Sequence, residues 1–113
     1  MAVTPKSLAL NDQITGTTNA TTDTLYTANN GTAQIDAFTA INTSGIAVNI
    51  SIYILPTGVA ATAASPVIVS VPADSQVIIA DLIGHKIPKS GTIEAFADTT
   101  NVLRIIASGV EFT

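Results

Sequence analysis

The residues able to do acid–base or nucleophilic chemistry are few in this chain. His85 is the single histidine among 113 residues, and a hydrolytic triad needs a histidine held between a nucleophile and an orienting carboxylate. No Gly-x-Ser-x-Gly turn is present to expose a nucleophile. His85 lies within Gly84–Pro88, a segment typical of a turn between strands. We therefore interpret His85 as an exposed loop residue and expect no enzymatic activity.

Metal and cofactor sites are equally weak in the sequence. Asp81, His85 and Glu94 are the nearest candidate ligands, but their spacing matches no zinc or calcium loop. The chain has no cysteine, which excludes thiolate sites and disulfides. Its seven glycines are dispersed and form no phosphate-binding loop. The sequence thus predicts no metal and no cofactor.

Glu94 and Arg104 form the most interesting charged pair. If residues 91–97 and 102–108 form a hairpin, one register places Glu94 opposite Arg104 as an exposed cross-strand ion pair. That register puts Ile93, Ala95, Leu103 and Ile105 on one face. The other face carries Glu94, Phe96, Val102, Arg104 and Ile106. Because this second face combines few charges with exposed apolar side chains, we expect it to contact another subunit.

The composition is unusual in its shortage of charge. Charged residues make up 11% of the chain, against about 25% in ordinary soluble domains. Hydrophobic residues make up 47% and the mean hydropathy is +0.49. The polar positions are filled mainly by Thr, Ser and Asn. Faces without Lys and Glu lack the charges that normally block association, so the composition favours a surface that lies against other proteins.

Net charge and hydropathy also exclude several partners. The formal net charge is −4, and the four basic residues, Lys6, Lys86, Lys89 and Arg104, are scattered. Nucleic-acid binding needs clustered basic residues, and anionic membranes attract them, so we expect neither partner. No apolar stretch approaches the roughly 20 residues of a membrane helix. The first residues do not resemble a secretory signal, so we expect folding and assembly in a cytoplasm.

The pattern from Leu25 onward is typical of β-structure. Residues Ile46–Leu55 alternate with a period of two, which excludes a helix and predicts a strand with one buried face. Turn-forming Gly, Pro, Asn and Asp residues separate further strand candidates, which are Ala33–Thr43, Pro66–Val71, Gln76–Ile83, Gly91–Ala97 and Val102–Phe112. This spacing predicts an all-β, antiparallel β-sandwich, jelly-roll-like, with an immunoglobulin-like sandwich as the alternative.

Two segments do not follow the strand pattern. Residues 1–24 are rich in Thr and Asn with scattered apolar residues, which predicts an extended N-terminal arm beside a sandwich of residues 25–113. The alternative is a flexible N-terminal tail without a functional role. The Ala-rich segment Gly58–Ser65 fits either a short helical turn or a flat loop packed on a neighbour.

Within the predicted strand Ala33–Thr43, we expect Ile35 to share one side with Thr39 while Phe38 lies opposite.

Several stretches resemble one known group of proteins. They are Leu25–Thr27 followed by an Asn/Gly turn, Ala33–Thr43, Val48–Leu55 ending at Pro56, Val71–Ala73, Gly91–Ala95 and Ala107–Glu111. This layout is similar to that of small tailed-phage virion proteins of the capsid decoration or cement type. The resemblance covers about residues 25–112 and lies in the succession of strand and turn segments.

The resemblance implies a structural protein on the outer surface of a phage head, made in the bacterial cytoplasm. It implies binding to the major capsid protein, stabilisation of the capsid lattice and a homo-oligomer, commonly a trimer, with no catalytic residues. The alternative is a tail, baseplate or fibre-associated module for adhesion or receptor binding. The low aromatic content of 4%, without Trp, disfavours glycan binding. The arm would reach between capsomers. The arm and the second face of the expected hairpin together give the candidate interface residues, which are Leu8, Leu10, Ile14, Glu94, Phe96, Val102, Arg104 and Ile106.

Overall fold

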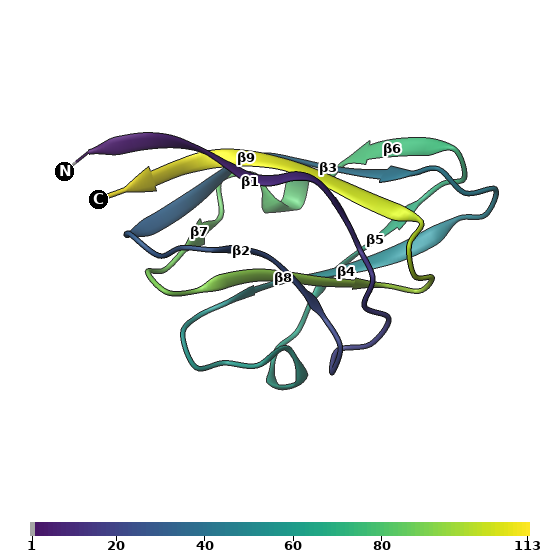
Figure 1. Cartoon of the computed structure of the whole chain (residues 1–113), viewed down its shortest axis with the longest axis horizontal. Coiled ribbons are helices and arrows are strands. Elements are labelled where there is room, and N and C mark those ends of the chain that lie inside the picture. The colour runs from purple at the N-terminus through teal and green to yellow at the C-terminus, as the bar shows by residue number, and fades with distance from the viewer. Residues whose placement is uncertain (1) are drawn as a thin grey trace.

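The computed structural model describes residues 2–113 and confirms an all-β, antiparallel sandwich. Within these residues there are nine strands and two short 3-10 helices (Figure 1). Their bounds are β1 Val3–Gln13, β2 Asp23–Thr27, β3 Thr32–Asn42, β4 Val48–Leu55, η1 Ala61–Ala63, β5 Val67–Val71, β6 Ser75–Ile78, η2 Ala80–Leu82, β7 Lys86–Ile87, β8 Thr92–Ala97 and β9 Leu103–Phe112.

The strands of residues 2–113 divide into a five-stranded and a four-stranded sheet. The five-stranded sheet has the order β1-β9-β3-β6, with β7 beside β3, and the four-stranded sheet has the order β2-β8-β4-β5. The first strand therefore pairs with the last, the second with the last but one, and the fourth with the fifth. This nesting is the topology of a jelly roll and differs from the immunoglobulin-like alternative. Figure 1 shows the two sheets as an upper and a lower layer.

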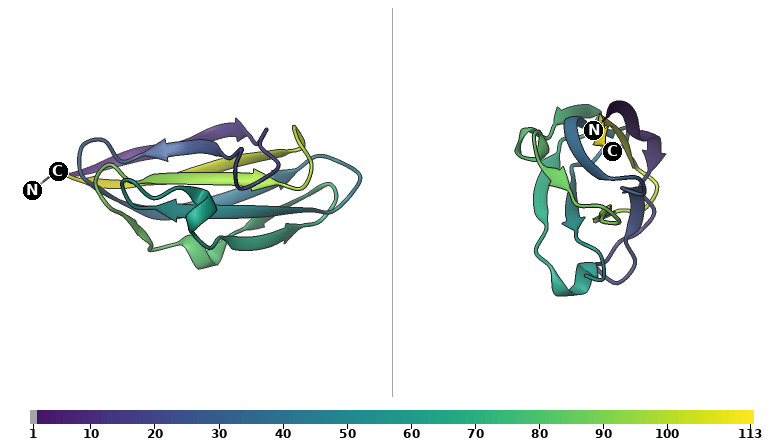
Figure 2. Two further views of the ribbon diagram at one scale, coloured as in Figure 1. Left: turned by 90° about the horizontal axis from the view of Figure 1, so that it is seen from below. Right: turned by 90° about the vertical axis from the view of Figure 1, so that its left-hand side faces the viewer.

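The core lies between the two sheets, which are seen nearly end-on in the right-hand view of Figure 2. Both sheets contribute fully buried β-branched or aromatic side chains. β-branched residues suit a pleated surface that packs on a second sheet. The largest contributors include Phe38 and Ile35 of β3, Ile50 of β4, Ile93 of β8 and Ile105 of β9.

The predicted N-terminal arm is wrong, because β1 is a strand of the sandwich. It pairs with β9 from Val3 opposite Phe112 to Gln13 opposite Arg104. Two register shifts, between Ser7 and Ala9 and between Leu10 and Asp12, interrupt the pairing. Each bulge changes which face the next side chains occupy, so β1 has no regular alternation in sequence. Residues 2–24 belong to the fold, and Met1 lies outside the described residues.

Two other strand predictions need correction. A register shift between Ile35 and Ala37 places both Ile35 and Phe38 in the core, so they do not lie on opposite faces as expected. The predicted strand Gln76–Ile83 is instead the short β6 followed by the 3-10 turn η2. This stretch is apolar on both sides because it leaves the sheet edge and turns inward at Leu82, which is buried.

The strand predicted at Ile46–Leu55 is confirmed as β4, although it begins at Val48. Its second face is also buried from Ser51 onward, which the alternation did not predict. The Ala-rich segment explains this burial. It forms the 3-10 turn η1, whose Ala61 joins Tyr53 and Leu55 in a small second core on the outer side of the four-stranded sheet. Both interpretations of this segment, helical turn and packed loop, are therefore correct in part.

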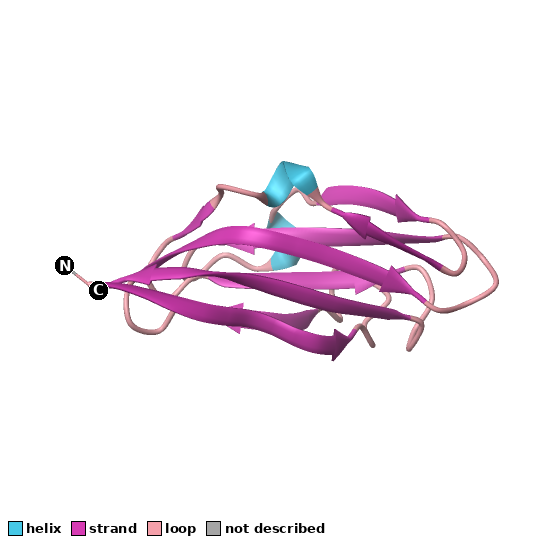
Figure 3. Cartoon of the chain, turned by 90° about the horizontal axis from the view of Figure 1, so that it is seen from above, coloured by secondary structure: helices cyan, strands magenta, loops and turns pink. Residues whose placement is uncertain are grey.

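The two ends of the described chain lie together at one end of the elongated molecule, whose extents are 46 × 27 × 19 Å. The backbone N–H of Ala2 donates to Thr113 at 2.8 Å, and the N–H of Thr113 donates back to Ala2 at 2.9 Å. Figures 2 and 3 show the strands running along the long axis from this common end.

Candidate functional site

The predicted hairpin between β8 and β9 is wrong. β8 lies between β2 and β4 in the four-stranded sheet, whereas β9 lies between β1 and β3 in the other sheet. The chain crosses from one sheet to the other through residues 98–102. Glu94 therefore sits opposite Thr24 and Tyr53, and Arg104 sits opposite Gln13 and Ile41. The four residues expected on one face of this hairpin are all buried, but they lie on two sheets that face each other across the core; they are Ile93, Ala95, Leu103 and Ile105.

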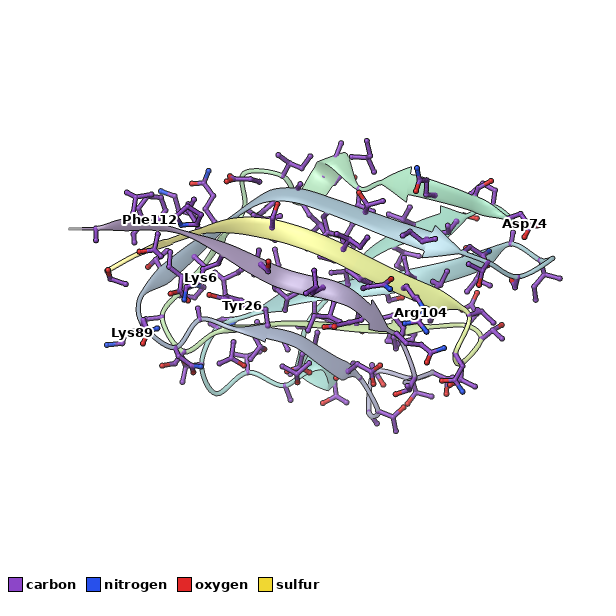
Figure 4. The ribbon with its side chains drawn as sticks, turned by 45° about the horizontal axis from the view of Figure 1, so that its top comes forward. Lys6, Tyr26, Asp74, Lys89, Arg104 and Phe112 are labelled. Atoms are coloured by element: carbon purple, nitrogen blue, oxygen red, sulfur yellow. The ribbon has the colours of Figure 1, made fainter. Side chains whose placement is uncertain are left out.

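Glu94 and Arg104 each make local contacts on their own sheet. Glu94 accepts hydrogen bonds from the hydroxyl groups of Thr22 at 2.6 Å and Thr92 at 3.0 Å. The guanidinium of Arg104 donates to the backbone oxygen of Asn11 at 3.1 Å. Asn11 has a φ of 59° and lies in the second bulge of β1, so Arg104 braces that bulge (Figure 4).

Several of the other predicted interface residues belong to the interior. Leu8 and Ile14 are buried in the main core, and Val102 packs against it. Phe96 is half-buried on the outer side of the four-stranded sheet, where its ring centroid is 6.2 Å from that of Tyr53. Leu10 and Ile106 are the two predicted apolar residues that remain exposed.

Leu10 and Ile106 lie side by side on the outer face of the five-stranded sheet, and they begin a row that crosses it. Ile106 is opposite Leu10 on β1 and Thr39 on β3, and Thr39 is opposite Ile78 on β6. Leu10, Ile106 and Ile78 are 76%, 44% and 69% exposed. We call Leu10, Ile106, Thr39 and Ile78 the apolar row. The sequence did not reveal Ile78, because membership depends on the register of four strands.

The rest of this outer face is also poor in charge. Register places Ile41 beside Arg104, and Val110 and Phe112 further along β9 toward the chain ends. Charged residues on the face are Arg104, the exposed Lys86 of β7 and Asp36 in the β3 bulge. Thr39, Ile41, Gln76, Ile78 and Ile106 line an open hollow across it. The face thus resembles the centre of an interface, where charge is depleted.

The centre of the opposite outer face is covered by the chain itself. Residues 56–66 fold over the four-stranded sheet, where Tyr53, Leu55 and Ala61 become buried. Within the described residues, the molecule therefore covers the centre of this outer face, with Ile68 left exposed near the β5 edge, and leaves the outer face of the five-stranded sheet uncovered. This asymmetry singles out the five-stranded sheet as the candidate docking face.

A buried carboxylate joins the two sheets near the chain ends. Glu111 of β9 accepts a hydrogen bond from the hydroxyl of Tyr26 of β2, and its Oε1 lies 3.7 Å from Lys6 Nζ. Figure 4 shows Lys6 and Tyr26 close together at this end. Burial, aided by the hydrogen bond to Glu111 and its charge, raises the pKa of Tyr26 well above its usual value. The cluster connects β1, β2 and β9, which is a structural task.

His85 and the candidate metal ligands do not converge. His85 is exposed, and its backbone pairs with Ile35 and Leu82 at the β7 side of the five-stranded sheet. Asp81 lies in η2, whereas Glu94 belongs to the other sheet. Across residues 2–113, no group of three or more metal-binding side chains comes together. The same residues contain no helix of the length and hydropathy needed to span a bilayer.

Comparison with known proteins identifies no relative. No family model matches the chain, and neither the curated proteins nor the solved structures contain a significant match.

Proposed function

We propose that this chain is a structural virion protein of the capsid decoration or cement type, which docks on the outside of a phage head. The observation that carries the proposal is the uncovered outer face of the five-stranded sheet with its apolar row. A partner surface that covered Leu10, Ile106 and Ile78 would remove apolar area from water, which is the main driving force of protein association.

The size of this face suits a repetitive partner. β1, β3 and β9 each offer about 33 Å of length and the four-residue β6 about 13 Å; at a strand spacing of about 4.8 Å they present roughly 500 Å². Specific interfaces usually bury about 800 Å² on each partner, so a single contact of this kind gives modest affinity. Many equivalent sites on a shell compensate for modest affinity when the bound protein is itself an oligomer.

A decoration protein acts through linkage, and this fold suits that role. Binding only the mature lattice stabilises it by about 2.7 kcal/mol per site at a hundredfold excess of protein over Kd. The role needs a rigid body and a docking face. By analogy of architecture alone, jelly rolls are common in viral capsid and lectin domains. The resemblance of residues 25–112 to small phage virion proteins supports the same proposal.

Binding to phage heads tests the proposal. Heads from a phage lacking this gene are mixed with the chain, and bound protein and heat resistance are measured. We expect Leu10→Asp and Ile78→Asp to weaken binding at least tenfold, because each buries a charge at the contact. Ile46→Asp is the matched control, since Ile46 is 58% exposed but lies in the β3–β4 loop.

Two results would contradict the proposal. One is binding of the Leu10 and Ile78 variants at the wild-type level. The other is a copy number of a few per virion instead of hundreds, which would indicate the tail or baseplate alternative.

A further inference from the structure

Strand β5 forms an edge of the four-stranded sheet that lacks the usual protection. Within residues 2–113 it pairs with β4 alone, without a register shift. The other outer strands are interrupted or short: β1 has two bulges and Pro5, β2 has a bulge, and β6 has four residues. Residues 37–73 contain no charged side chain. Native proteins use bulges, charges or covers to keep edge strands from pairing, and β5 has neither bulge nor charge.

The register identifies which backbone groups of β5 face outward. The backbone N–H of Asn49 donates to the Asp98 carboxylate at 3.2 Å, and its carbonyl accepts from the Asp98 N–H at 3.1 Å. Asn49 therefore directs its backbone toward β8 and away from Ser70, its opposite residue on β5. Because bonded and non-bonded pairs alternate in antiparallel ladders, Ser70 and Ile68 direct their N–H and C=O groups to the free edge.

The sequence around this edge is close to self-complementary. It reads Pro66-Val67-Ile68-Val69-Ser70-Val71-Pro72, which is symmetric about Val69 except for Ile68 and Ser70. We propose that β5 pairs antiparallel with the β5 strand of a second copy of this chain, about a two-fold axis at Val69. In that register Ile68 lies opposite the partner's Ser70, and the two symmetric pairs form four backbone hydrogen bonds. The prolines end the pairing on both sides, since they donate no hydrogen bond.

Side-chain packing favours the same register. Val67 and Val69 are half-buried and pack against the main core from its open side. With the axis at Val69, this residue meets the partner's Val69 as a non-bonded pair, in which side chains approach closely. The pairing would cover the open side of both cores and join two four-stranded sheets into one. The opposing strands bring no charge together, so nothing electrostatic opposes the contact.

This inference does not depend on the docking face, which lies on the other sheet. The contact is small compared with a standard interface, so we expect a dimer that forms as concentration rises. A two-fold contact gives dimers, whereas the phage resemblance implies trimers, and the two assemblies differ in mass. On a shell, the same contact would tie neighbouring copies together.

The test is sedimentation or light scattering of the full chain from micromolar to millimolar concentration. We expect the mass to rise from 11.5 kDa toward twice that value. Ile68→Lys should raise the dimer Kd at least tenfold, because Ile68 is 63% exposed at the free edge and lysine protects edge strands. Ile78→Lys is the matched control with similar exposure on the other sheet, and it should dimerise normally while binding heads poorly.

Hydrogen exchange supplies a second readout. The amides of Ile68 and Ser70 should be protected in concentrated wild-type protein and exchange freely in dilute protein. A wild-type chain that remains monomeric at millimolar concentration would overturn the proposal. So would a trimeric mass, an unchanged dimer in Ile68→Lys, or free exchange of both amides in the dimer. None of these results bears on head binding, which the Ile78 variant reports separately.

Discussion

Tyr26 of β2 donates its hydroxyl proton to Glu111 of β9, a carboxylate that is only 2% exposed, and this hydrogen bond ties the two sheets together. Glu111 is one of the few charged residues of the chain, and it is placed inside. Lys6 of β1 approaches its other oxygen at 3.7 Å. Three strands from two sheets thus depend on one buried group near the end where the chain ends meet.

Removing the Tyr26 hydroxyl should destabilise the fold. Tyr26→Phe leaves the buried carboxylate without its donor, so we expect the free energy of unfolding to fall by about 1–3 kcal/mol. Urea denaturation measures the change. Tyr53→Phe is the control, because no hydrogen bond of the Tyr53 hydroxyl is present among the described residues, and it should cost less than about 0.5 kcal/mol. Equal losses in both variants would contradict the structural role of Tyr26.

Stability at alkaline pH should carry the signature of Tyr26. Its pKa is raised in the folded protein above the usual value of 10.0. Above pH 10 the folded protein therefore keeps the Tyr26 hydroxyl proton, whereas the unfolded chain loses it. The stabilisation is complete below that value and is lost as pH rises above it. We expect the free energy of unfolding to fall more steeply above pH 10 in the wild type than in Tyr26→Phe. Parallel curves for the two proteins would exclude this linkage.

Lys6 and Glu111 should be energetically coupled. Lys6→Met removes the positive charge beside a buried carboxylate, and because Lys6 is partly exposed we expect a loss of about 1–2 kcal/mol, below that of a fully buried pair. Adding Glu111→Gln should recover part of the loss, since the double variant buries no charge. A double-mutant cycle in urea measures the coupling. Additive effects would show that the two charges do not interact.

Leu8 and Leu10 offer a direct test of the place of β1 in the fold. Leu8 is buried in the core, whereas Leu10 lies in the exposed apolar row. We expect Leu8→Ala to cost about 2–5 kcal/mol and Leu10→Ala to stay within about 0.5 kcal/mol, measured by thermal or urea unfolding. Similar small effects for both would restore the idea of a separate arm.

Gly109 should not tolerate a side chain. A Cβ at this position in β9 would lie 2.0 Å from the carbonyl oxygen of Gln34 on β3, so Gly109→Ala must shift the central pairing of the five-stranded sheet. We expect a loss of several kcal/mol or failure to fold, assessed by circular dichroism and thermal unfolding. Gly45→Ala is the control, because nothing lies within 4 Å of its added Cβ. A neutral Gly109→Ala would contradict the pairing of β3 with β9.

The local pattern of the sequence predicted elements better than partners. The alternation from Val48 to Leu55 is a direct trace of the pleat, and β4 is found there. The alternation fails at Asp36 and within residues 7–12, where bulges insert single residues that no period can reveal. The sequence pattern therefore predicts an arm where residues 3–13 form a full strand.

The candidate site was predicted only in part, for a topological reason. Leu10 and Ile106 were both named from the sequence, but nothing local indicates that they are neighbours on one sheet. The sequence predicts a pairing of Glu94 with Arg104 because a short turn separates their strands. In a jelly roll, such consecutive strands can lie in opposite sheets, and the chain leaves no local signal of that crossing. Ile78 joins the row only through the register of β6 with β3.

The meeting of Ala2 and Thr113 at one pole has a practical consequence. A peptide fused before residue 2 and one fused after residue 113 would emerge side by side. They would leave the sandwich at the end near Phe112, which lies opposite the end that carries Arg104 (Figure 4). A short linker could also join these two positions, so that the chain is reopened at a surface loop such as the one containing Gly45. Peptides fused at both ends of the jelly roll would thus lie at one end of the molecule. The outer face of the five-stranded sheet and the β5 edge would remain free to bind.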